Sequence, residues 1–413
     1  MNAATQIVIV NGKAAGAITY GHGPQFTYTD AYVDAESTPL SLSMPVRSDH
    51  TYSHHVVGPW LAGLLPNTTT AARPSTGNHA NALQALGRDC AGAVQLAGVD
   101  DLEDVLRGPG YLEEAPDTLI GHRIRRLHTA PYPWAHPGEH WTLAGHQPKF
   151  VLTATDTGWA FPHANSASTH IVKPVHNTIA INEYLCQNSL AALGFPTSTP
   201  IYHEFDGISA LITARYDRAL TRTAVRRIHQ EDLCQALSVW PHNKLPTNGG
   251  PTTVTIARTL ARHTHPADVD RFCDSVIARY LLGDIDGHAK KYSIILATDD
   301  AALAPLYGTT SALPYRTDPA KGPRRLATAI GGHTHLGALT YRHIERFAVN
   351  AGTDPTRLID ATARMASQLP DAIAAAAGTL PQTHQRFAAH LQDSIAHHCT
   401  ALATGRTPVA AAS

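Results

Sequence analysis

Between Gly283 and Ser293 the sequence reads GDIDGHAKKYS, which places an aspartate, a histidine and two lysines in one short polar loop. In protein kinases an aspartate in such a loop orients the attacking hydroxyl and accepts its proton. Asp286 fits that role. Kinase loops place a metal-binding asparagine five residues later, and here that position is Lys291. A cation therefore stands where a divalent metal would need a ligand.

The segments on either side of this loop predict how it is held. Apolar residues recur at positions 269, 272, 273, 276, 277, 280 and 281, the spacing of a buried helix face. Gly283 is expected to end that helix, and residues 292–296, YSIIL, are expected to form a short strand. Helix, polar loop and strand together are typical of a kinase catalytic loop.

A second pair of residues upstream suits the same chemistry. Lys173 lies in THIVKPV, which predicts a strand, and Glu183 follows ten residues later in a predicted helix that ends at GFP, residues 194–196. In kinases a strand lysine contacts the α- and β-phosphates of ATP and pairs with a helix glutamate. The next segment contains the dipeptide Asp206–Gly207, a strong signal for a β-hairpin.

The segment TLAGHQPK, residues 142–149, is expected to form the turn over the phosphates. Its candidate binding residues are Gly145, Gln147 and Lys149. A single glycine makes a weak phosphate-loop signal, and Lys149 also suits a surface ion pair.

Each of these residues also has an ordinary structural interpretation. Lys173 and Glu183 suit a surface pair, Asp286 suits the turn after a helix, and Lys291 suits a side chain in solvent. A kinase has a second metal-binding carboxylate shortly after the strand that follows the catalytic loop. Asp299 and Asp300 are alternative sources of that carboxylate.

Bulk properties exclude several classes of function. The chain has 413 residues and a net charge of −1, which disfavours direct nucleic-acid binding. No apolar run is long enough to span a membrane, and the N-terminus lacks the features of a secretory signal. The five cysteines form no CxxC pair, which favours reduced thiols and a cytoplasmic location. The 26 histidines show no zinc-site spacing and are interpreted as solvated or packed side chains.

Taken in order, the motifs resemble the HipA family of bacterial toxin–antitoxin Ser/Thr kinases. The resemblance runs over nearly the whole chain, through PLSLSMPV, LAGLLPN, GRDCAGAV, LAGHQPKF, HIVKPV, NEYLC, RYDR, HQEDLCQAL, DGHAKKYS and LAPLYGTTSALPY. So many motifs in the family's order make chance agreement very improbable.

The resemblance implies an α+β class with a HipA-like protein-kinase fold. Residues 1–115 would form an N-terminal α+β subdomain and residues 116–217 a β-rich kinase N-lobe. Residues 218–405 would form a helical C-lobe that carries the catalytic loop, and residues 406–413 a tail. Beyond HQEDLCQAL the chain is expected to be helical to about residue 403.

The resemblance also implies roles for single residues. Asp286 would be the catalytic base, with His288 and Lys290 beside it in the active site. Lys173 would bind the phosphates of the cofactor ATP, and backbone from Thr213 to Arg215 would contact the adenine. Thr142 stands where family members can carry an autophosphorylated serine.

Two positions depart from the family pattern. The family's catalytic loop ends in Lys–Asn and its metal segment reads Tyr–Asp, whereas this chain has Lys290–Lys291 and Tyr307–Gly308. Both expected metal ligands are absent, so no metal-binding residue is assigned and magnesium is doubtful.

Two hypotheses therefore stand side by side. The first is an ATP-dependent Ser/Thr kinase, the toxin of a toxin–antitoxin module, that acts on a protein substrate. The second is a pseudokinase that binds nucleotide or an antitoxin without turnover. In both, the partner would be a HipB-like helix-turn-helix antitoxin through which DNA is reached indirectly. Lys291 is expected to replace part of the metal's charge and, with glycine at position 308, to lack a carboxylate partner and stay available for phosphate.

Overall fold

The computed structural model describes residues 5–66, 76–108, 110–127, 134–221, 224–316 and 322–404. The chain divides into two units. The first comprises residues 1–174, 203–243 and 293–301, and the second comprises residues 175–202, 244–292 and 302–413. The predicted tail, residues 406–413, lies outside the described residues. The predicted boundaries at residues 115 and 217 stay predictions.

The first unit begins with a five-stranded sheet in the order β4-β3-β2-β1-β5. Its strands are β1 (Thr5–Val10), β2 (Lys13–Tyr20), β3 (Pro24–Tyr28), β4 (Thr51–Tyr52) and β5 (Val94–Gly98). Asn11 and Gly12 join β1 to β2 with positive φ angles of 52° and 75°, as a tight hairpin requires. Alternate residues of β3 are buried against Trp60 and its neighbours, so this subdomain has its own apolar core.

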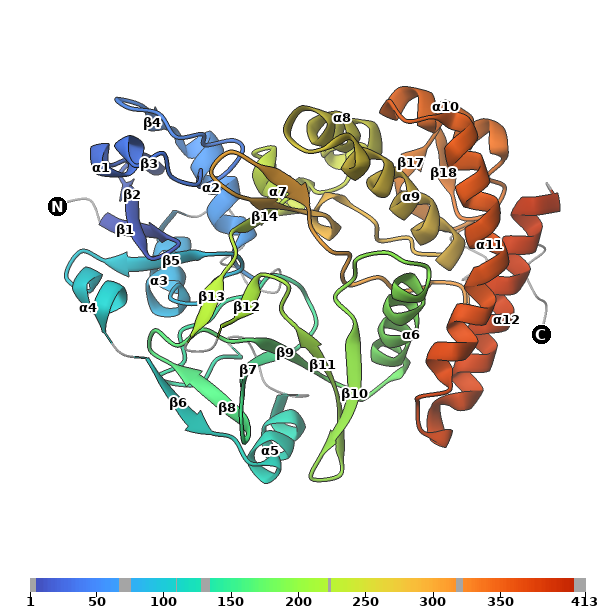
Figure 1. The fold of residues 1–413 in the computed structure, drawn as a ribbon, viewed down its shortest axis with the longest axis horizontal. Coiled ribbons are helices and arrows are strands. Elements are labelled where there is room, and N and C mark those ends of the chain that lie inside the picture. The colour runs from blue at the N-terminus through green and yellow to red at the C-terminus, as the bar shows by residue number, and fades with distance from the viewer. Residues whose placement is uncertain are drawn as a thin grey trace. The chain divides into compact units, whose positions relative to one another are not determined.

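Helices cover this sheet and lead to the next one (Figure 1). They are α1 (Asp30–Asp34), α2 (His54–Gly63), α3 (Thr76–Leu86), α4 (Leu102–Arg107) and α5 (Asp117–Leu127).

A six-stranded sheet of order β10-β11-β9-β7-β8-β6 follows. Its strands are β6 (Tyr111–Glu114), β7 (Phe150–Thr155), β8 (Gly158–His163), β9 (His170–Pro174), β10 (Pro200–Phe205) and β11 (Ile208–Ala214). The predicted hairpin is confirmed, because Asp206 and Gly207 connect β10 to β11 with φ angles of 50° and 72°. Apolar side chains of β7, β9 and β11 pack with α5 in one core.

Short elements complete the first unit. They are β12 (Arg218–Leu220), β13 (Val225–Arg227), β14 (Gln230–Asp232), α7 (Leu233–Ala236), the 3-10 turn η2 (Pro241–Asn243) and β15 (Ser293–Leu296). Strand β14 pairs with β15, and β15 with β16 (Ala301–Leu303). The strand predicted after the catalytic loop is therefore confirmed.

The second unit is mainly helical, as expected. Its elements are α6 (Thr178–Ala192), η3 (Pro246–Asn248), α8 (Thr253–His263), α9 (Pro266–Leu282), η4 (Ala289–Lys291), β17 (Arg325–Ile330), β18 (His333–His335), α10 (Tyr341–Ala351), α11 (Pro355–Ala377) and α12 (Gln382–Thr404). Helix α11 packs against α6, α9 and α12 (Figure 1). The expectation of uninterrupted helix is wrong at β16 and at the hairpin of β17 and β18, where Gly331 and Gly332 take φ angles of 56° and 88° and turn the chain.

No described helix is long and apolar enough to cross a membrane. All five cysteines are buried as free thiols. The chain is thus a mixed α+β protein, which confirms the predicted class.

Five charged side chains lie together inside the first unit: Asp89, Arg215, Asp217, Arg218 and Arg227. Arg215 contacts Asp89 at 3.3 Å and Asp217 at 2.8 Å, and Arg218 contacts the same carboxylates at 2.8 and 3.0 Å. Burial raises the pKa of Asp89, but the three arginines outweigh burial and lower it. This buried ion network joins the loop before β5 to the segment after β11.

Glu231 in β14 is another buried acid, and no cation is among the groups that shift its pKa. Its Oε1 accepts a hydrogen bond of 2.7 Å from the backbone N–H of Leu42, and its Oε2 has no hydrogen-bond partner within the described residues. Burial raises the pKa of Glu231 from 4.5 to about 8, against the opposing hydrogen bonds from Ser41 and Leu42. The carboxyl is therefore held in its neutral form in the folded protein at pH 7.

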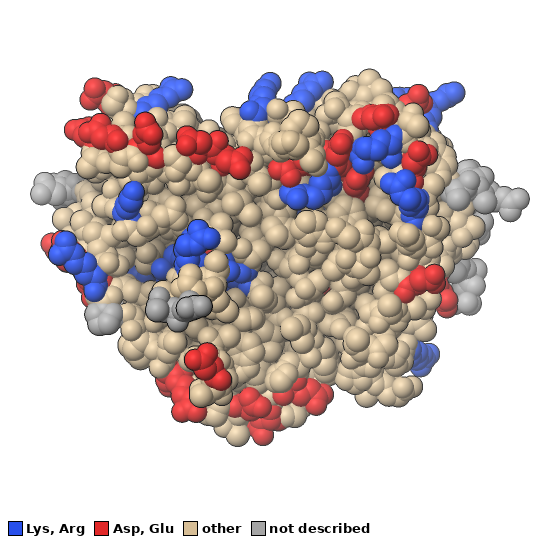
Figure 2. Space-filling model, viewed as in Figure 1, with Lys and Arg blue, Asp and Glu red and all other residues tan. Residues whose placement is uncertain are grey.

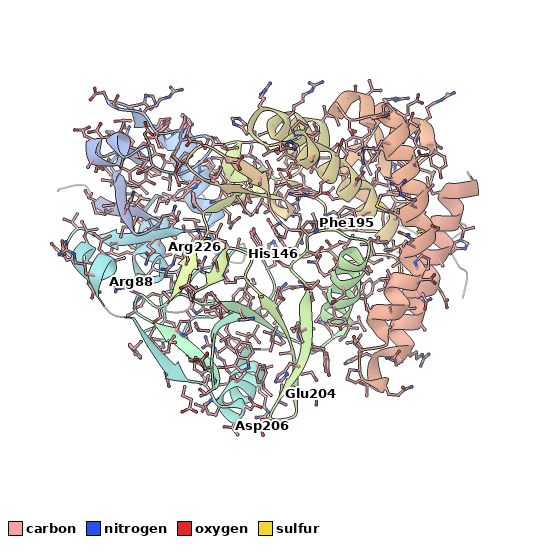
Figure 3. All side chains as sticks on the ribbon, in the orientation of Figure 1. Arg88, His146, Phe195, Glu204, Asp206 and Arg226 are labelled. Atoms are coloured by element: carbon pink, nitrogen blue, oxygen red, sulfur yellow. The ribbon has the colours of Figure 1, made fainter. Side chains whose placement is uncertain are left out.

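Replacing Glu231 by glutamine is expected to flatten the pH dependence of stability. Between pH 4.5 and about 8 the unfolded chain ionises this carboxyl while the folded chain keeps it protonated. The folded state of the parent therefore loses stability as pH rises through this range, and the deficit persists above it. Glu231→Gln should have nearly the parent's melting temperature at pH 4.5 and a higher one at pH 9. The exposed Glu204, labelled in Figure 3, supplies the control Glu204→Gln. Equal pH profiles for parent and Glu231→Gln would contradict the assignment.

Candidate functional site

Helix α9 ends where the sequence predicts, at Gly283. The glycine takes a left-handed φ of 76°, and a Cβ at this position would lie 2.4 Å from Cγ of Leu313. Both the backbone conformation and the contact require glycine. The chain therefore leaves the helix sharply and enters the loop that carries Asp286.

An ion pair that sequence reasoning missed fixes this loop. Arg279, in the last turn of α9, contacts Asp284 at 2.5 Å, and both side chains are buried. The second carboxylate oxygen of Asp284 accepts a hydrogen bond of 2.8 Å from the N–H of Asp286. The only sequence signal was a lone arginine in an apolar stretch with an aspartate five residues later.

The same arginine reaches two backbone segments. Its Nη2 donates to the carbonyls of Lys291 at 3.4 Å and Tyr307 at 3.1 Å. The hydroxyl of Tyr307 donates to the carbonyl of Lys290 at 2.9 Å, and the Lys290 side chain is buried. Arg279 thus holds the catalytic loop against the segment in which a metal ligand was expected.

Asp286 and His288 come together as predicted neighbours. Nε2 of His288 lies 3.4 Å from Oδ1 of Asp286. The pKa of His288 is lowered to about 3, chiefly by burial; Asp286 raises it, and Lys244, Lys291 and Lys290 lower it. His288 is therefore neutral at pH 7. Burial raises the pKa of Asp286, but Lys291, His288 and Lys244 outweigh it and lower the pKa. The Asp286 carboxylate is ionised, and its side chain is 54% exposed.

Lys291 has a carboxylate partner, contrary to expectation. The 3-10 turn η4 brings its ammonium back over the loop, where Nζ lies 3.4 Å from Oδ2 of Asp286. Nζ also donates a hydrogen bond of 2.8 Å to the carbonyl of Gly308. The expectation of an unpartnered Lys291 was wrong because it considered position 308 alone and not the fold of the turn.

The residues present do not fit a divalent metal of the kinase type. Hard cations such as Mg²⁺ need oxygen ligands, and positions 291 and 308 offer an ammonium and a glycine. Across the described ranges, no group of three or more His, Cys, Asp or Glu side chains is arranged to hold a metal ion. Asp299 and Asp300, the alternative carboxylates, are exposed in the turn between β15 and β16.

Helix α6 positions Glu183 and anchors the metal segment. Glu183 is buried. On the same helix Asn182 exchanges two hydrogen bonds of 2.8 Å with the backbone of Ser311. Gln187 donates to the carbonyl of Leu306 at 3.2 Å and accepts from the N–H of Thr309 at 3.3 Å. Sequence reasoning missed these two amides, because they read as ordinary polar helix residues.

The predicted phosphate turn belongs to the first unit, together with His146, which Figure 3 labels. Gly145 has a φ of 113°, which disfavours other residues, and a Cβ there would lie 3.1 Å from Nζ of Lys149. Nζ of Lys149 donates to the carbonyl of Gln147 at 2.8 Å and lies 4.7 Å from the ring centre of Trp134. These contacts give the turn a defined shape, and its role with phosphate stays a prediction.

Two further predicted residues have defined surroundings. Lys173 lies in β9 opposite Leu211, while Glu183 belongs to the second unit, so their pairing stays a prediction. Thr142 is buried, and its hydroxyl donates to the carbonyl of Leu64 at 3.0 Å. Phosphorylation of Thr142 therefore requires that this segment first leave its position.

Arg215 belongs to the buried ion network of the first unit. Its side chain contacts Asp89 and Asp217, its N–H donates to the carbonyl of Thr169 at 2.9 Å, and its carbonyl accepts from Arg218 at 3.2 Å. These contacts give the Arg215 side chain a structural role. The expected contact of the backbone from Thr213 to Arg215 with adenine stays a prediction.

Comparison with known families and proteins gives a consistent result. Residues 6–97 match the family described as HipA N-terminal domain, and residues 141–373 match the HipA-like C-terminal domain. The Sinorhizobium fredii protein "Putative kinase Y4mE" is 33% identical over 385 residues, which cover 87% of this chain and 90% of that protein. A second protein of that organism, "Putative kinase Y4dM", is 25% identical over 373 residues, covering 82% and 83%.

A solved structure agrees in fold. The HipA chain from the Shewanella oneidensis complex of HipA, HipB and operator DNA superposes with a TM-score of 0.83 at 23% identity, covering 97% of each chain. At this identity the likeness shows the fold. With both family matches, which together span most of the sequence, and with the Y4mE relative, it establishes that the chain belongs to the HipA family.

Proposed function

We propose that this chain is a HipA-type Ser/Thr protein kinase with ATP as cofactor, and the toxin of a toxin–antitoxin module. The observation that carries the proposal is the state of Asp286. Its carboxylate is ionised and half exposed, and Arg279 and Asp284 hold the loop under it. A carboxylate in this state suits a base that receives the proton of a substrate hydroxyl.

The reaction follows from the residues present. The hydroxyl oxygen of a protein serine or threonine forms a bond to the γ-phosphorus of ATP. The bond from that phosphorus to the bridging oxygen breaks, ADP leaves, and the hydroxyl proton passes to Asp286. Lys291 is the side chain of this loop proposed to stabilise phosphate charge, and buried, neutral His288 supports the position of Asp286. The phosphate contacts of Lys149 and Lys173, which belong to the first unit, stay predictions.

A second candidate function is a pseudokinase. It is favoured by the contact between Lys291 and Asp286 at 3.4 Å, since a substrate hydroxyl must compete with that ammonium for the carboxylate. The absence of metal ligands at positions 291 and 308 favours it too.

The proposed partner is a HipB-like helix-turn-helix antitoxin, through which the complex would reach DNA. Support comes from the Shewanella oneidensis structure, which is a complex of HipA, HipB and operator DNA. A net charge of −1 fits an indirect role in DNA binding. Figure 2 shows both basic and acidic side chains on the face in view. The proposed site of action is the cytoplasm.

A phosphotransfer assay separates the two candidates. Purified protein is incubated with γ-labelled ATP and a general protein acceptor, with magnesium or with a chelator, and ATP binding is titrated in parallel. A kinase gives slow transfer to serine or threonine that Asp286→Asn removes. Nucleotide binding without transfer under both conditions establishes the pseudokinase. Growth arrest on expression, relieved by a helix-turn-helix protein from the adjacent reading frame, tests the toxin role.

A further inference from the structure

Three of the seven lysines of the chain belong to the surroundings of Asp286. Lys290 and Lys291 close the catalytic loop, and Lys244 lies between η2 and η3 in the same unit. All three lysines lower the pKa of His288, and Lys244 and Lys291 also lower the pKa of Asp286. Lys244 was not predicted from the sequence. Lys291 and Lys244 stand beside the exposed carboxylate of Asp286, and their positive charge favours an anionic ligand at the loop.

The ammonium of Lys291 lies where a metal ligand on residue 308 would begin. A Cβ added to Gly308 would be 3.2 Å from Nζ of Lys291, tighter than most contacts of this kind. A carboxylate on residue 308 would therefore meet the ammonium before it met a metal. A carboxylate at position 308 and the ammonium of Lys291 would compete for the same space.

The backbone around the ammonium is fixed. Arg279 holds the carbonyls of Lys291 and Tyr307, and Lys291 itself donates to the carbonyl of Gly308 at 2.8 Å. Hydrogen bonds from two sides thus hold the Lys291 ammonium in place, and its side chain does not simply extend into solvent. Its side chain is 22% exposed, so it remains within reach of a ligand.

We propose that Lys291 takes the place of the divalent metal, so that this site binds the polyphosphate of a nucleoside triphosphate that carries no metal ion. This inference rests on the proposed nucleotide-binding function and specifies its ligand. A metal-free triphosphate carries two more negative charges than its complex with a divalent cation, and the lysines around Asp286 favour the more anionic form. On binding, Lys291 exchanges a partly exposed contact with Asp286, which is a weak kind of ion pair, for a stronger, charge-assisted hydrogen bond to phosphate. Its bond to the carbonyl of Gly308 is kept.

The test is a titration with two probes, ATP and inorganic tripolyphosphate, each in EDTA and in excess magnesium. The variants are Lys291→Met and the control Lys13→Met, which removes an exposed lysine at the start of β2. The parent and Lys13→Met should bind both probes at least as tightly in EDTA as in magnesium. Lys291→Met should weaken binding in EDTA by about 10–100-fold, the range for hydrogen bonds to charged groups.

Each outcome has one meaning. Tighter ATP binding in magnesium than in EDTA by tenfold or more overturns the inference but leaves a kinase function standing. Loss of affinity in Lys13→Met equal to that in Lys291→Met overturns it as well. Binding of tripolyphosphate through Lys291 without phosphotransfer supports the inference and refutes the kinase. Absence of binding for both probes in folded protein, verified by its melting temperature, overturns the inference and nucleotide binding together.

Discussion

The double variant Lys291→Asn with Gly308→Asp is expected to gain magnesium-dependent phosphotransfer, at a rate about 10²–10³ above the parent, the range for one preorganised electrostatic partner. The change removes the ammonium and supplies an amide and a carboxylate on the two segments that Arg279 holds together. The left-handed φ of 58° at position 308 is one that aspartate tolerates better than most residues. The measurement is transfer of labelled phosphate with and without magnesium.

The single variants and a base variant serve as controls. Gly308→Asp alone should place a carboxylate against Lys291 and form an internal ion pair, without a gain in rate. Lys291→Asn alone supplies only one ligand. Adding Asp286→Asn to the double variant should return transfer to background. If the double variant binds nucleotide and still transfers no phosphate with magnesium, the site differs from an active kinase at more than these two positions.

Replacing Asp89 by asparagine is expected to destabilise the first unit by about 3–5 kcal/mol, the cost of removing one partner from a buried ion pair. Three arginines influence this carboxylate, and two of them, Arg215 and Arg218, are themselves buried. Without the Asp89 carboxylate, Asp217 would be the acid left in the network to offset the buried arginines. Urea unfolding of parent and variant at pH 7 measures the difference in free energy.

The matched control is Asp206→Asn. Asp206, labelled in Figure 3, makes an exposed ion pair of 3.3 Å with Arg125, and asparagine also accepts its positive φ angle. Its loss should cost no more than about 1 kcal/mol. Because the pKa of Asp89 is lowered, its contribution is present above the ordinary aspartate pKa and is lost as pH falls below it. The two variants should therefore converge in acid, and equal losses at pH 7 would refute the role of the network.

The elements that local patterns specify were predictable from the sequence. The apolar stripe and Gly283 defined α9, the segment THIVKPV defined β9, and Asp206 and Gly207 defined the hairpin of β10 and β11. In these segments the signal lies within one or two helical turns or one strand pair, so no distant contact is needed.

The details that distant contacts decide were not predictable. The partner of the Arg215 side chain, Asp89, is 126 residues away in sequence, and no local pattern indicated it. The pairing of Lys291 with Asp286 depends on η4, whose carbonyls are held from Tyr307 and Arg279. Likewise the amides of Asn182 and Gln187 gain a role only when α6 meets residues 306–311. The sequence identified which residues belong to the candidate site, whereas the partners that these residues contact could be found only from the folded structure.

The contacts of Arg279 have a consequence for how such a site changes over evolution. This arginine holds main-chain carbonyls of the catalytic loop and of the neighbouring segment, and every amino acid supplies a carbonyl. Side chains at positions 291 and 308 can therefore be exchanged while the backbone path is kept. A lineage could pass between a metal-using and a metal-free form by a few point mutations, with intermediates that still fold and are selected only on activity. Loss of Arg279 itself would close that route, because neither backbone segment would then be held in place.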